Sequence, residues 1–238
     1  MEFIRQNPQQ YIQSESSVLN KTSLNAVDVA DLELTPLLFQ TGYLTIESQT
    51  GDGQYTLRGP NLEVEKAFNT NIIRFLTGQN ESSITDLTEK IRKALETFDS
   101  AALGAAFSRI LRWVSHQEQP ALERFHHALI FSVLKALHFK VASEVSEAEG
   151  MFDFLIHVPP GTVFIAEFKY EKLAIEPGEK NEEKNEIKRR KLLTKALNDA
   201  KTQIKNRRYE ARYSDEYPVV KKLAVGIAGK TDVVAEIY

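Results

Sequence analysis

Three residues able to do chemistry lie on two apolar segments that flank a Pro159-Pro160-Gly161 turn. Asp153 precedes Pro160 by seven residues and Glu167 follows it by seven, so a hairpin centred on Pro160 places their side chains opposite each other. Their Cβ atoms would be about 4.5–5.5 Å apart. Lys169, two residues after Glu167, would point to the same side. Because opposed carboxylates repel, this spacing predicts a divalent metal ion between them.

The alternation of side chains along both segments supports a hairpin. Apolar residues occupy the even positions: Phe152, Phe154, Ile156, Val158, Phe164, Ala166, Phe168 and Tyr170. The odd positions carry Asp153, His157, Glu167 and Lys169 together with Leu155, Val163 and Ile165. This pattern is typical of a half-buried hairpin with one apolar face. The alternative is a surface hairpin with a cross-strand carboxylate pair, which the repulsion of opposed like charges disfavours.

The elements around this hairpin predict an α/β fold. Apolar residues recur at helical spacing over 121–137, and a strand is expected at 140–145. After the hairpin come a hydrophilic, exposed excursion (171–186), a long basic helix (187–208) and two closing strands (219–228 and 233–237). This order predicts a mixed central sheet flanked by helices over residues 119–238.

The preceding residues predict a smaller element. We expect a short helix over 25–34, and Gly51-Asp52-Gly53 indicates a hairpin between strands that end near residue 46 and begin at 54. Asn61 is suited to cap a helix over 62–76, which Gly78 would end. We interpret residues 1–80 as winged-helix-like. Amphipathic helices at 86–95 and 101–114 would form a helical linker over 81–118.

Composition excludes several classes of protein. With 238 residues, 42% of them hydrophobic, the chain can build a substantial core. It has no cysteine, so disulfides and thiolate metal sites are excluded. No apolar run approaches the length of a membrane span, and the polar N-terminus lacks a signal-peptide core. We therefore expect a cytoplasmic protein with no membrane partner.

Basic residues are concentrated near the end of the chain, although the net charge is −3. Residues 184–212 contain eleven basic and three acidic side chains. Such a stripe suits a nucleic-acid backbone, and Lys201, Lys205, Arg207 and Arg208 are the candidate contacts. The alternative is an ordinary solvated helix face, and the sequence alone leaves both interpretations open.

The ordered set of polar motifs resembles a known family. The set comprises Glu123-Arg124-Phe125-His126-His127, Glu144, Gly150 through Asp153, Glu167-Phe168-Lys169, and Gln203-Ile204 with Tyr209. Together they resemble the PD-(D/E)XK nuclease superfamily, and within it the bacterial branch found C-terminal to AAA-ATPase-like domains. The resemblance implies a restriction-endonuclease-like core from about residue 119 onward. It also implies an AAA-type ATPase region as partner in cis or in trans, although the chain has no GxxxxGK[ST] phosphate loop.

The resemblance also implies roles for individual residues. Asp153, Glu167 and the Phe168 carbonyl would bind Mg²⁺ or Mn²⁺, a choice that suits oxygen ligands. Lys169 would orient the attacking water or stabilise charge on the phosphorus. Glu123 would hold a water of the metal shell or help bind a second ion, and Gln203 would help order the site. A helix-terminal Glu123 that merely complements the helix dipole, and a Gln203 that merely packs, are the simpler alternatives.

We therefore expect a Mg²⁺-dependent deoxyribonuclease, acting in bacterial DNA processing or defence, with a homodimer as one assembly to test. One departure from the family pattern is Met151, which stands where an arginine often follows the glycine. A rival hypothesis is a catalytically silent nucleic-acid-binding or regulatory module that partners an AAA-type ATPase. A third is a protein-interaction module with little affinity for DNA.

Overall fold

The computed structural model describes the chain apart from residues 1–3, 5, 15–17, 26–32, 115–121, 148–149, 174–181 and 207–212. For residues 122–124, 144–147 and 150–151 only the backbone is described. The chain forms two compact units that interleave in sequence. Met1–Glu81 and Gln117–His138 make the first unit, and Ser82–His116 and Phe139–Tyr238 make the second. Among the described residues, no helix has the length and apolar character to cross a membrane.

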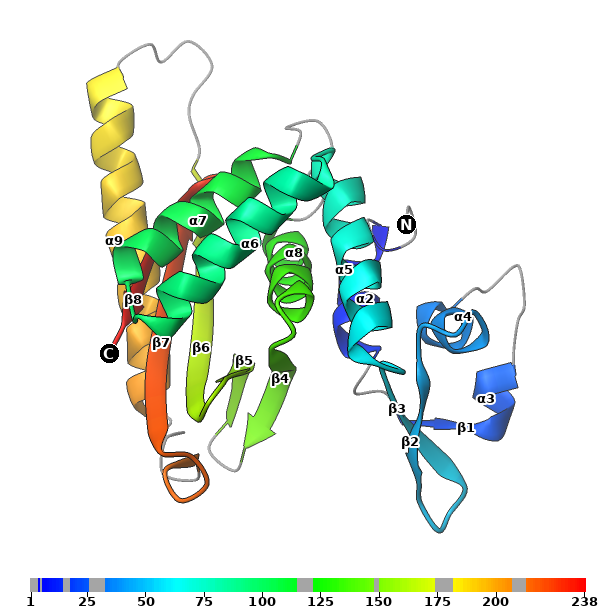
Figure 1. Ribbon diagram of the computed structural model, residues 1–238. Coiled ribbons are helices and arrows are strands. Elements are labelled where there is room, and N and C mark those ends of the chain that lie inside the picture. Colours follow the sequence, from blue (N-terminus) through cyan, green and yellow to red (C-terminus); the bar gives the residue numbers. More distant parts are fainter. Residues whose placement is uncertain are drawn as a thin grey trace. The chain divides into compact units, whose positions relative to one another are not determined.

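The first unit combines helices with a small antiparallel sheet (Figure 1). Its elements are α2 (Pro8–Gln13), β1 (Val18–Asn20), α3 (Lys21–Asn25), α4 (Leu34–Gln40), β2 (Thr45–Gln49), β3 (Gln54–Arg58), α5 (Leu62–Thr77) and α8 (Leu122–Ala136). The strand order is β1-β3-β2. Asn61 accepts a hydrogen bond from the Val64 N–H at 2.9 Å, and Gly78 ends α5 at φ 67°, so both predicted helix signals are confirmed.

The second unit is a mixed sheet between two layers of helices (Figure 1). Its strands are β4 (Lys140–Glu147), β5 (Gly150–Val158), β6 (Thr162–Glu171), β7 (Val219–Ala228) and β8 (Asp232–Ile237). They lie in this order, with β6 and β7 parallel and the other pairs antiparallel. The helices are α6 (Glu81–Glu96), α7 (Ser100–Arg112) and α9 (Glu182–Asn206). The predicted α/β architecture is confirmed.

Helices cover both faces of this sheet. On one face, Phe107 of α7 packs against Phe168 of β6, with 6.1 Å between ring centroids. On the other face, α9 buries a stripe of residues spaced four apart, of which Ala200 and Ile204 pack with Ala224 of β7. Parallel pairing to β7 requires a crossover from β6, and α9 lies within it. The sheet is therefore sandwiched, and both faces of its central strands are buried.

Burial of both faces corrects the prediction of a half-buried hairpin. Leu155, Val163 and Ile165, on the face expected to be polar, form a buried cluster with Tyr213. Phe152 joins this cluster and not the apolar face on which Phe154 packs against Phe168. The strict alternation therefore does not continue through Asp153, which separates Phe152 from Phe154.

Several boundaries also differ from the predictions. α9 begins at Glu182, five residues before the predicted start, so the hydrophilic excursion ends earlier than expected. Most of the expected helix at 25–34 lies outside the described residues. α7 and nearly all of α6 belong to the same compact unit as the five-stranded sheet, whereas a helical linker was predicted at 81–118. The division at residues 80 and 118 stays a prediction, as does the winged-helix interpretation.

Candidate active site

The hairpin has the register that the symmetric spacing around Pro160 predicts. The β5–β6 pairs run from Val158 opposite Thr162 to Phe154 opposite Ala166. The next step along both strands brings Asp153 level with Glu167, where the described backbone pairing has stopped. The two carboxylate residues therefore lie side by side at the point where β5 leaves the β6 ladder.

Asp153 fills the gap left by the interrupted ladder. Its Oδ2 atom accepts a hydrogen bond from the Phe168 backbone N–H at 2.7 Å. In a strand, the N–H and C=O of one residue face the same neighbouring strand. The Phe168 carbonyl therefore faces the same strand edge as the Asp153 carboxylate. This brings together two oxygen donors from the predicted ligand set.

Glu167 supplies the second carboxylate from inside the sheet. Its exposed fraction is 0%, and it pairs with Ala224 on the face that α9 covers. Lys169, two residues on, donates a hydrogen bond from Nζ to Glu167 Oε1 at 2.6 Å. A charge-assisted contact of this length offsets much of the cost of burying a carboxylate. Since the Lys169 side chain is 31% exposed, the cluster opens to solvent at the lysine.

The α9 backbone approaches β7 closely at Gly226, beside this cluster. Gly226 pairs with Lys169, and a Cβ atom at Gly226 would lie 2.7 Å from the Leu197 backbone nitrogen and 2.9 Å from the Leu193 carbonyl oxygen. Only the absence of a side chain permits this packing. Sequence analysis did not single out Gly226, although a glycine inside an apolar strand is a signal of close backbone approach.

Gln203 lies on the flank of α9 that faces β6. It follows Lys195 by two steps of four residues, so the two share a side of the helix. Lys195 donates to Glu171 of β6 at 2.5 Å, which identifies this flank. Gln203 is partly buried, and its neighbours Ala200 and Ile204 pack at the level of Ala224, the pairing partner of Glu167.

Lys201 and Lys205 lie on the opposite flank of the same helix. Lys201 donates to Glu236 of β8 at 2.5 Å, and Lys205, one turn later, is exposed. The structure therefore does not bring these two predicted backbone contacts together with Gln203. Arg207 and Arg208, with Tyr209, lie outside the described residues. The side chains of Glu123, Glu144 and Met151 also fall outside them.

The donor set fits a hard divalent cation. Within the described part of the chain, no group of three or more His, Cys, Asp or Glu side chains is arranged to hold a metal ion. Asp153, Glu167 and the Phe168 carbonyl would supply three oxygen atoms, and Mg²⁺ characteristically keeps several waters and binds through one or two carboxylates plus substrate phosphate. The residues present therefore suit Mg²⁺ or Mn²⁺.

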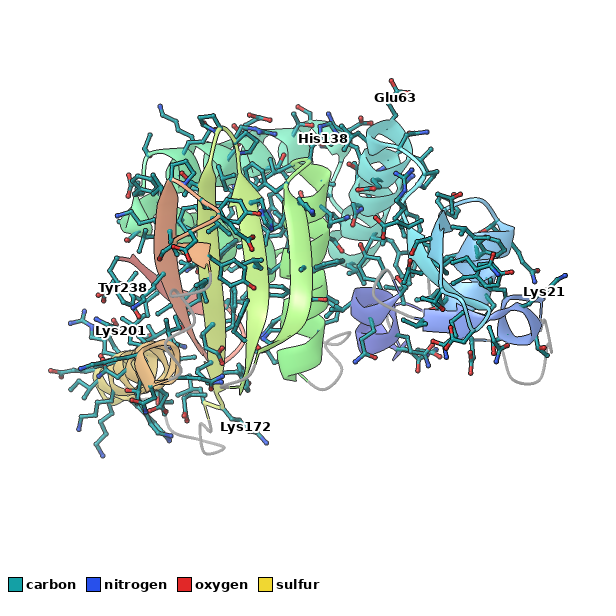
Figure 2. All side chains as sticks on the ribbon, turned by 90° about the horizontal axis from the view of Figure 1, so that it is seen from below. Lys21, Glu63, His138, Lys172, Lys201 and Tyr238 are labelled. Carbon is teal, nitrogen blue, oxygen red and sulfur yellow. The ribbon has the colours of Figure 1, made fainter. Side chains whose placement is uncertain are left out.

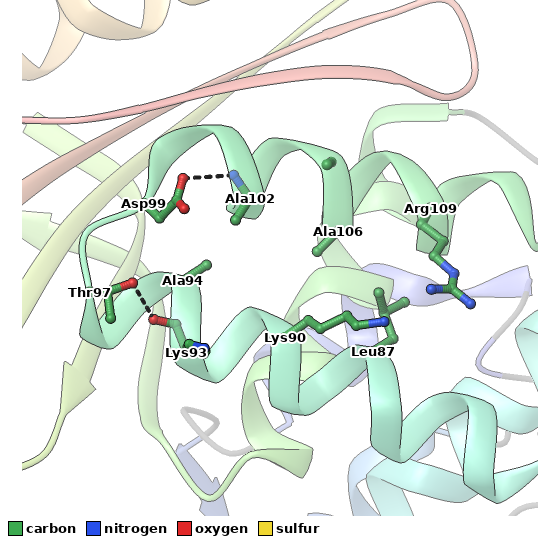
Figure 3. A pocket seen from close by; sticks show the side chains of 10 residues that line it. Leu87, Lys90, Lys93, Ala94, Thr97, Asp99, Ala102, Ala106 and Arg109 are labelled. Carbon is green, nitrogen blue, oxygen red and sulfur yellow. Dashed lines mark hydrogen bonds between the residues drawn. The ribbon is translucent and has the colours of Figure 1, made fainter.

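A pocket of about 430 Å³ between α6 and α7 is separate from this cluster (Figure 3). Its lining includes Leu87, Ala94 and Ala106, with Lys90 and Arg109 at its rim. Asp99 lies in the connection between α6 and α7. It accepts a hydrogen bond from the Ala102 N–H at 2.9 Å and so caps the N-terminus of α7. None of the predicted catalytic residues lines this pocket.

The order of the elements agrees with a comparison against known families. Residues 121–237 match the model of the PD-(D/E)XK nuclease superfamily. This match confirms the superfamily resemblance of the second half of the chain. It does not extend to the branch associated with AAA-type ATPases.

A curated relative comes from Azotobacter chroococcum mcd 1 and is described as an uncharacterized protein in the vnfD 5′ region. It is 28% identical over 155 residues, which is 61% of this chain. The chain spans 30% of the length of that relative. No solved structure matches the chain significantly.

Proposed function

We propose that residues 121–237 form a metal-dependent nuclease domain that hydrolyses phosphodiester bonds in DNA. The observation that carries the proposal is the meeting of Asp153, Glu167 and Lys169 where β5 leaves β6. Two carboxylates and an ammonium rarely gather in a buried sheet for stability alone. The superfamily match over these residues supports the same chemistry.

Asp153, Glu167 and the Phe168 carbonyl would hold the Mg²⁺ or Mn²⁺ ion. When bound, such an ion polarises the scissile phosphate and lowers the pKa of a coordinated water. The Phe168 N–H fixes the orientation of the Asp153 carboxylate, which pre-organises that ligand. Lys169 reaches from a partly exposed position and would stabilise negative charge that develops on the phosphoryl oxygens while orienting the attacking water.

The supporting roles of Glu123 and Gln203 come from the family resemblance, and those of the basic residues come from the charge pattern of the sequence. Glu123 would hold a water near the metal, and Gln203 would order the site from its flank of α9. Lys201, Lys205, Arg207 and Arg208 would contact the DNA backbone. Cleavage would leave 3′-hydroxyl and 5′-phosphate ends.

The wider setting of this activity is also part of the proposal. We place the protein in the cytoplasm of a bacterium, in DNA processing or defence. An AAA-type ATPase region would act with it in cis or in trans, and assembly as a homodimer is to be tested. Residues 1–80 would be a winged-helix-like remnant of the ATPase-associated region, and residues 81–118 a helical linker.

Cleavage of plasmid and of linear single- and double-stranded DNA tests the proposal. With Mg²⁺ or Mn²⁺ the wild-type protein should cut, and EDTA should stop it. Asp153→Ala, Glu167→Ala and Lys169→Ala should each lower the rate by about a hundredfold or more, because each removes a group that acts on the reacting phosphate.

Glu171→Ala is the matched control, since Glu171 lies on the same strand and its described partner is Lys195. It should cut at close to the wild-type rate. Full cleavage by all three site variants would rule out the assignment of the site. Equal loss in the Glu171 variant would point to damage of the strand and not to lost chemistry.

A further inference from the structure

A second pocket lies at the far side of α9 from Gln203. It has a volume of about 430 Å³ and is lined by Asn198, Lys201, Thr202 and Lys205 of α9, Lys222 of β7, and Tyr238. Figure 2 shows Lys201 and Tyr238 next to each other at this edge of the sheet. Sequence analysis named two of these lysines as candidate backbone contacts, but it did not single out Lys222, Tyr238 or a pocket.

Backbone pairing positions Lys222 and Tyr238 toward α9. The Lys222 N–H donates to the Tyr238 carbonyl at 2.9 Å, and the Tyr238 N–H donates back to Lys222 at 3.0 Å. Residues paired in this way project to the same face of a sheet. Ala224, two residues after Lys222, packs under α9, so Lys222 and Tyr238 share the α9 face.

Three lysines line the pocket around an aromatic ring. Lys201, Lys205 and Lys222 line it, while Glu236 neutralises Lys201 through a 2.5 Å contact. The ammonium groups of Lys201 and Lys222 lie 5.4 Å and 6.0 Å from the centroid of the Tyr238 ring. Lys205 and Lys222 offer ammonium donors that suit a phosphate group. The ring, together with the Asn198 amide and the Thr202 hydroxyl, suits a ligand that is both anionic and aromatic.

We propose that this pocket binds one nucleotide unit of a nucleic-acid strand, with its phosphate against Lys205 and Lys222 and its base against Tyr238. The unit is not the one that is cleaved. Glu167 lies on β6, two strands away from Tyr238 at about 4.8 Å per strand, and α9 packs on Ala224 between them. The pocket would thus anchor a segment of strand outside the reacting site. Its binding does not depend on catalysis.

Binding of a single-stranded oligothymidylate, about twelve nucleotides long, tests this inference. Fluorescence anisotropy of the labelled strand is measured with the full chain in EDTA, so that cleavage cannot interfere. Lys222→Gln and Lys205→Gln should each weaken binding several-fold. Each should also flatten the slope of log affinity against log salt by about 0.7, the value for one phosphate contact with a single strand.

Lys191→Gln is the matched control, because Lys191 is an exposed lysine of α9 that does not line the pocket. It should leave the affinity nearly unchanged. An equal loss in all three variants would show only diffuse attraction to a basic helix and would overturn the pocket. Retained binding in Lys222→Gln would overturn it as well. Lys205 is exposed, so its variant is expected to fold even if a change at Lys222 disturbs β7.

Two further experiments test whether the pocket binds a base and whether it binds a strand in preference to a free nucleotide. Tyr238→Leu should weaken oligothymidylate binding about tenfold through lost stacking, yet leave binding of tripolyphosphate unchanged. Equal effects on both would mean a phosphate-only site. Thymidine monophosphate that competes as tightly as the strand would mean a free-nucleotide site. Either result contradicts the proposal.

The proposals for the pocket and for the nuclease site can be contradicted independently of each other. Strand binding is measured in EDTA, without the metal ion that cleavage requires, so the two readouts are independent. Cleavage without pocket-dependent binding would overturn this inference alone. Pocket-dependent binding without metal-dependent cleavage would overturn the proposed function alone.

Discussion

Glu167 concentrates the energetic cost of the site in one side chain. A carboxylate with 0% exposure loses its hydration, and the cost is several kcal/mol unless a partner compensates. Lys169 compensates at 2.6 Å, and it does so from a partly exposed position, where a substrate phosphate could also reach it. An apolar residue at position 167 would serve the core at lower cost. This makes a chemical role the better explanation of Glu167.

The spacing of these residues was predictable, but one of their contacts was not. Equal distances from Pro160 predicted Asp153 level with Glu167, and the observed register agrees. The hydrogen bond from the Phe168 N–H to Asp153 depends on the ladder ending after Phe154. Side-chain periodicity assumes a regular ladder, so it carries no information about where pairing stops.

His157 gives a testable pH dependence of stability. Burial lowers its pKa below the usual 6.5; nearby Lys140 lowers it further, and Glu216 opposes the shift. The unfolded chain therefore takes up the proton at a higher pH than the folded protein does. This contribution to stability is complete above about pH 6.5 and is lost as the pH falls through that value toward the folded pKa.

Urea denaturation between about pH 7.5 and pH 5.5 measures this effect. We expect the wild type to lose more stability on acidification than His157→Gln does. Comparing the two cancels the contributions of the other four histidines. If the free energy of unfolding fell equally with pH in the two proteins, protonation of His157 would not destabilise the folded state.

At the scale of elements, local sequence signals predicted the type of each element well but its tertiary packing poorly. The cap at Asn61 and the stop at Gly78 are read from neighbouring residues, and both were predicted. Burial of Leu155 and Val163 depends on Tyr213, some fifty residues away in the sequence, which no local alternation reports. α9 shows the same limit, because its narrow stripe of Ala196, Ala200 and Ile204 gives only a weak periodic signal.

Gly226 should be intolerant of a side chain. In Gly226→Ala the new methyl group meets the α9 backbone at Leu193 and Leu197, and backbone cannot rotate away as a side chain can. Overpacking of this kind costs about 1–3 kcal/mol of unfolding free energy, which urea denaturation measures. The shift of α9 should also slow cleavage, since Lys169 pairs with Gly226.

Gly51→Ala is the control for this substitution. A Cβ atom there has nothing within 4 Å, so its stability should change by less than about 0.5 kcal/mol. If Gly226→Ala is as stable as this control, the helix is not held at the distance described.

At the scale of the whole molecule, charge and chemistry are unevenly distributed. The net charge of −3 hides a strongly basic α9 region next to the sheet that carries Asp153 and Glu167. The superfamily match covers residues 121–237, whereas the boundaries of the two compact units lie at 81–82, 116–117 and 138–139. The sequence therefore indicates the family-related segment more clearly than the division into units, because that division depends on contacts between distant segments.

The central claim is that Asp153 and Glu167 together bind a divalent metal ion. Electron paramagnetic resonance of free Mn²⁺, titrated into the full chain, measures this directly, because bound Mn²⁺ loses its sharp signal. We predict one Mn²⁺ bound by wild type and by Glu171→Gln, and none at that site in Asp153→Asn or Glu167→Gln. Undiminished binding in both site variants, or no binding by wild type, would contradict the claim and favour a module without metal-dependent chemistry.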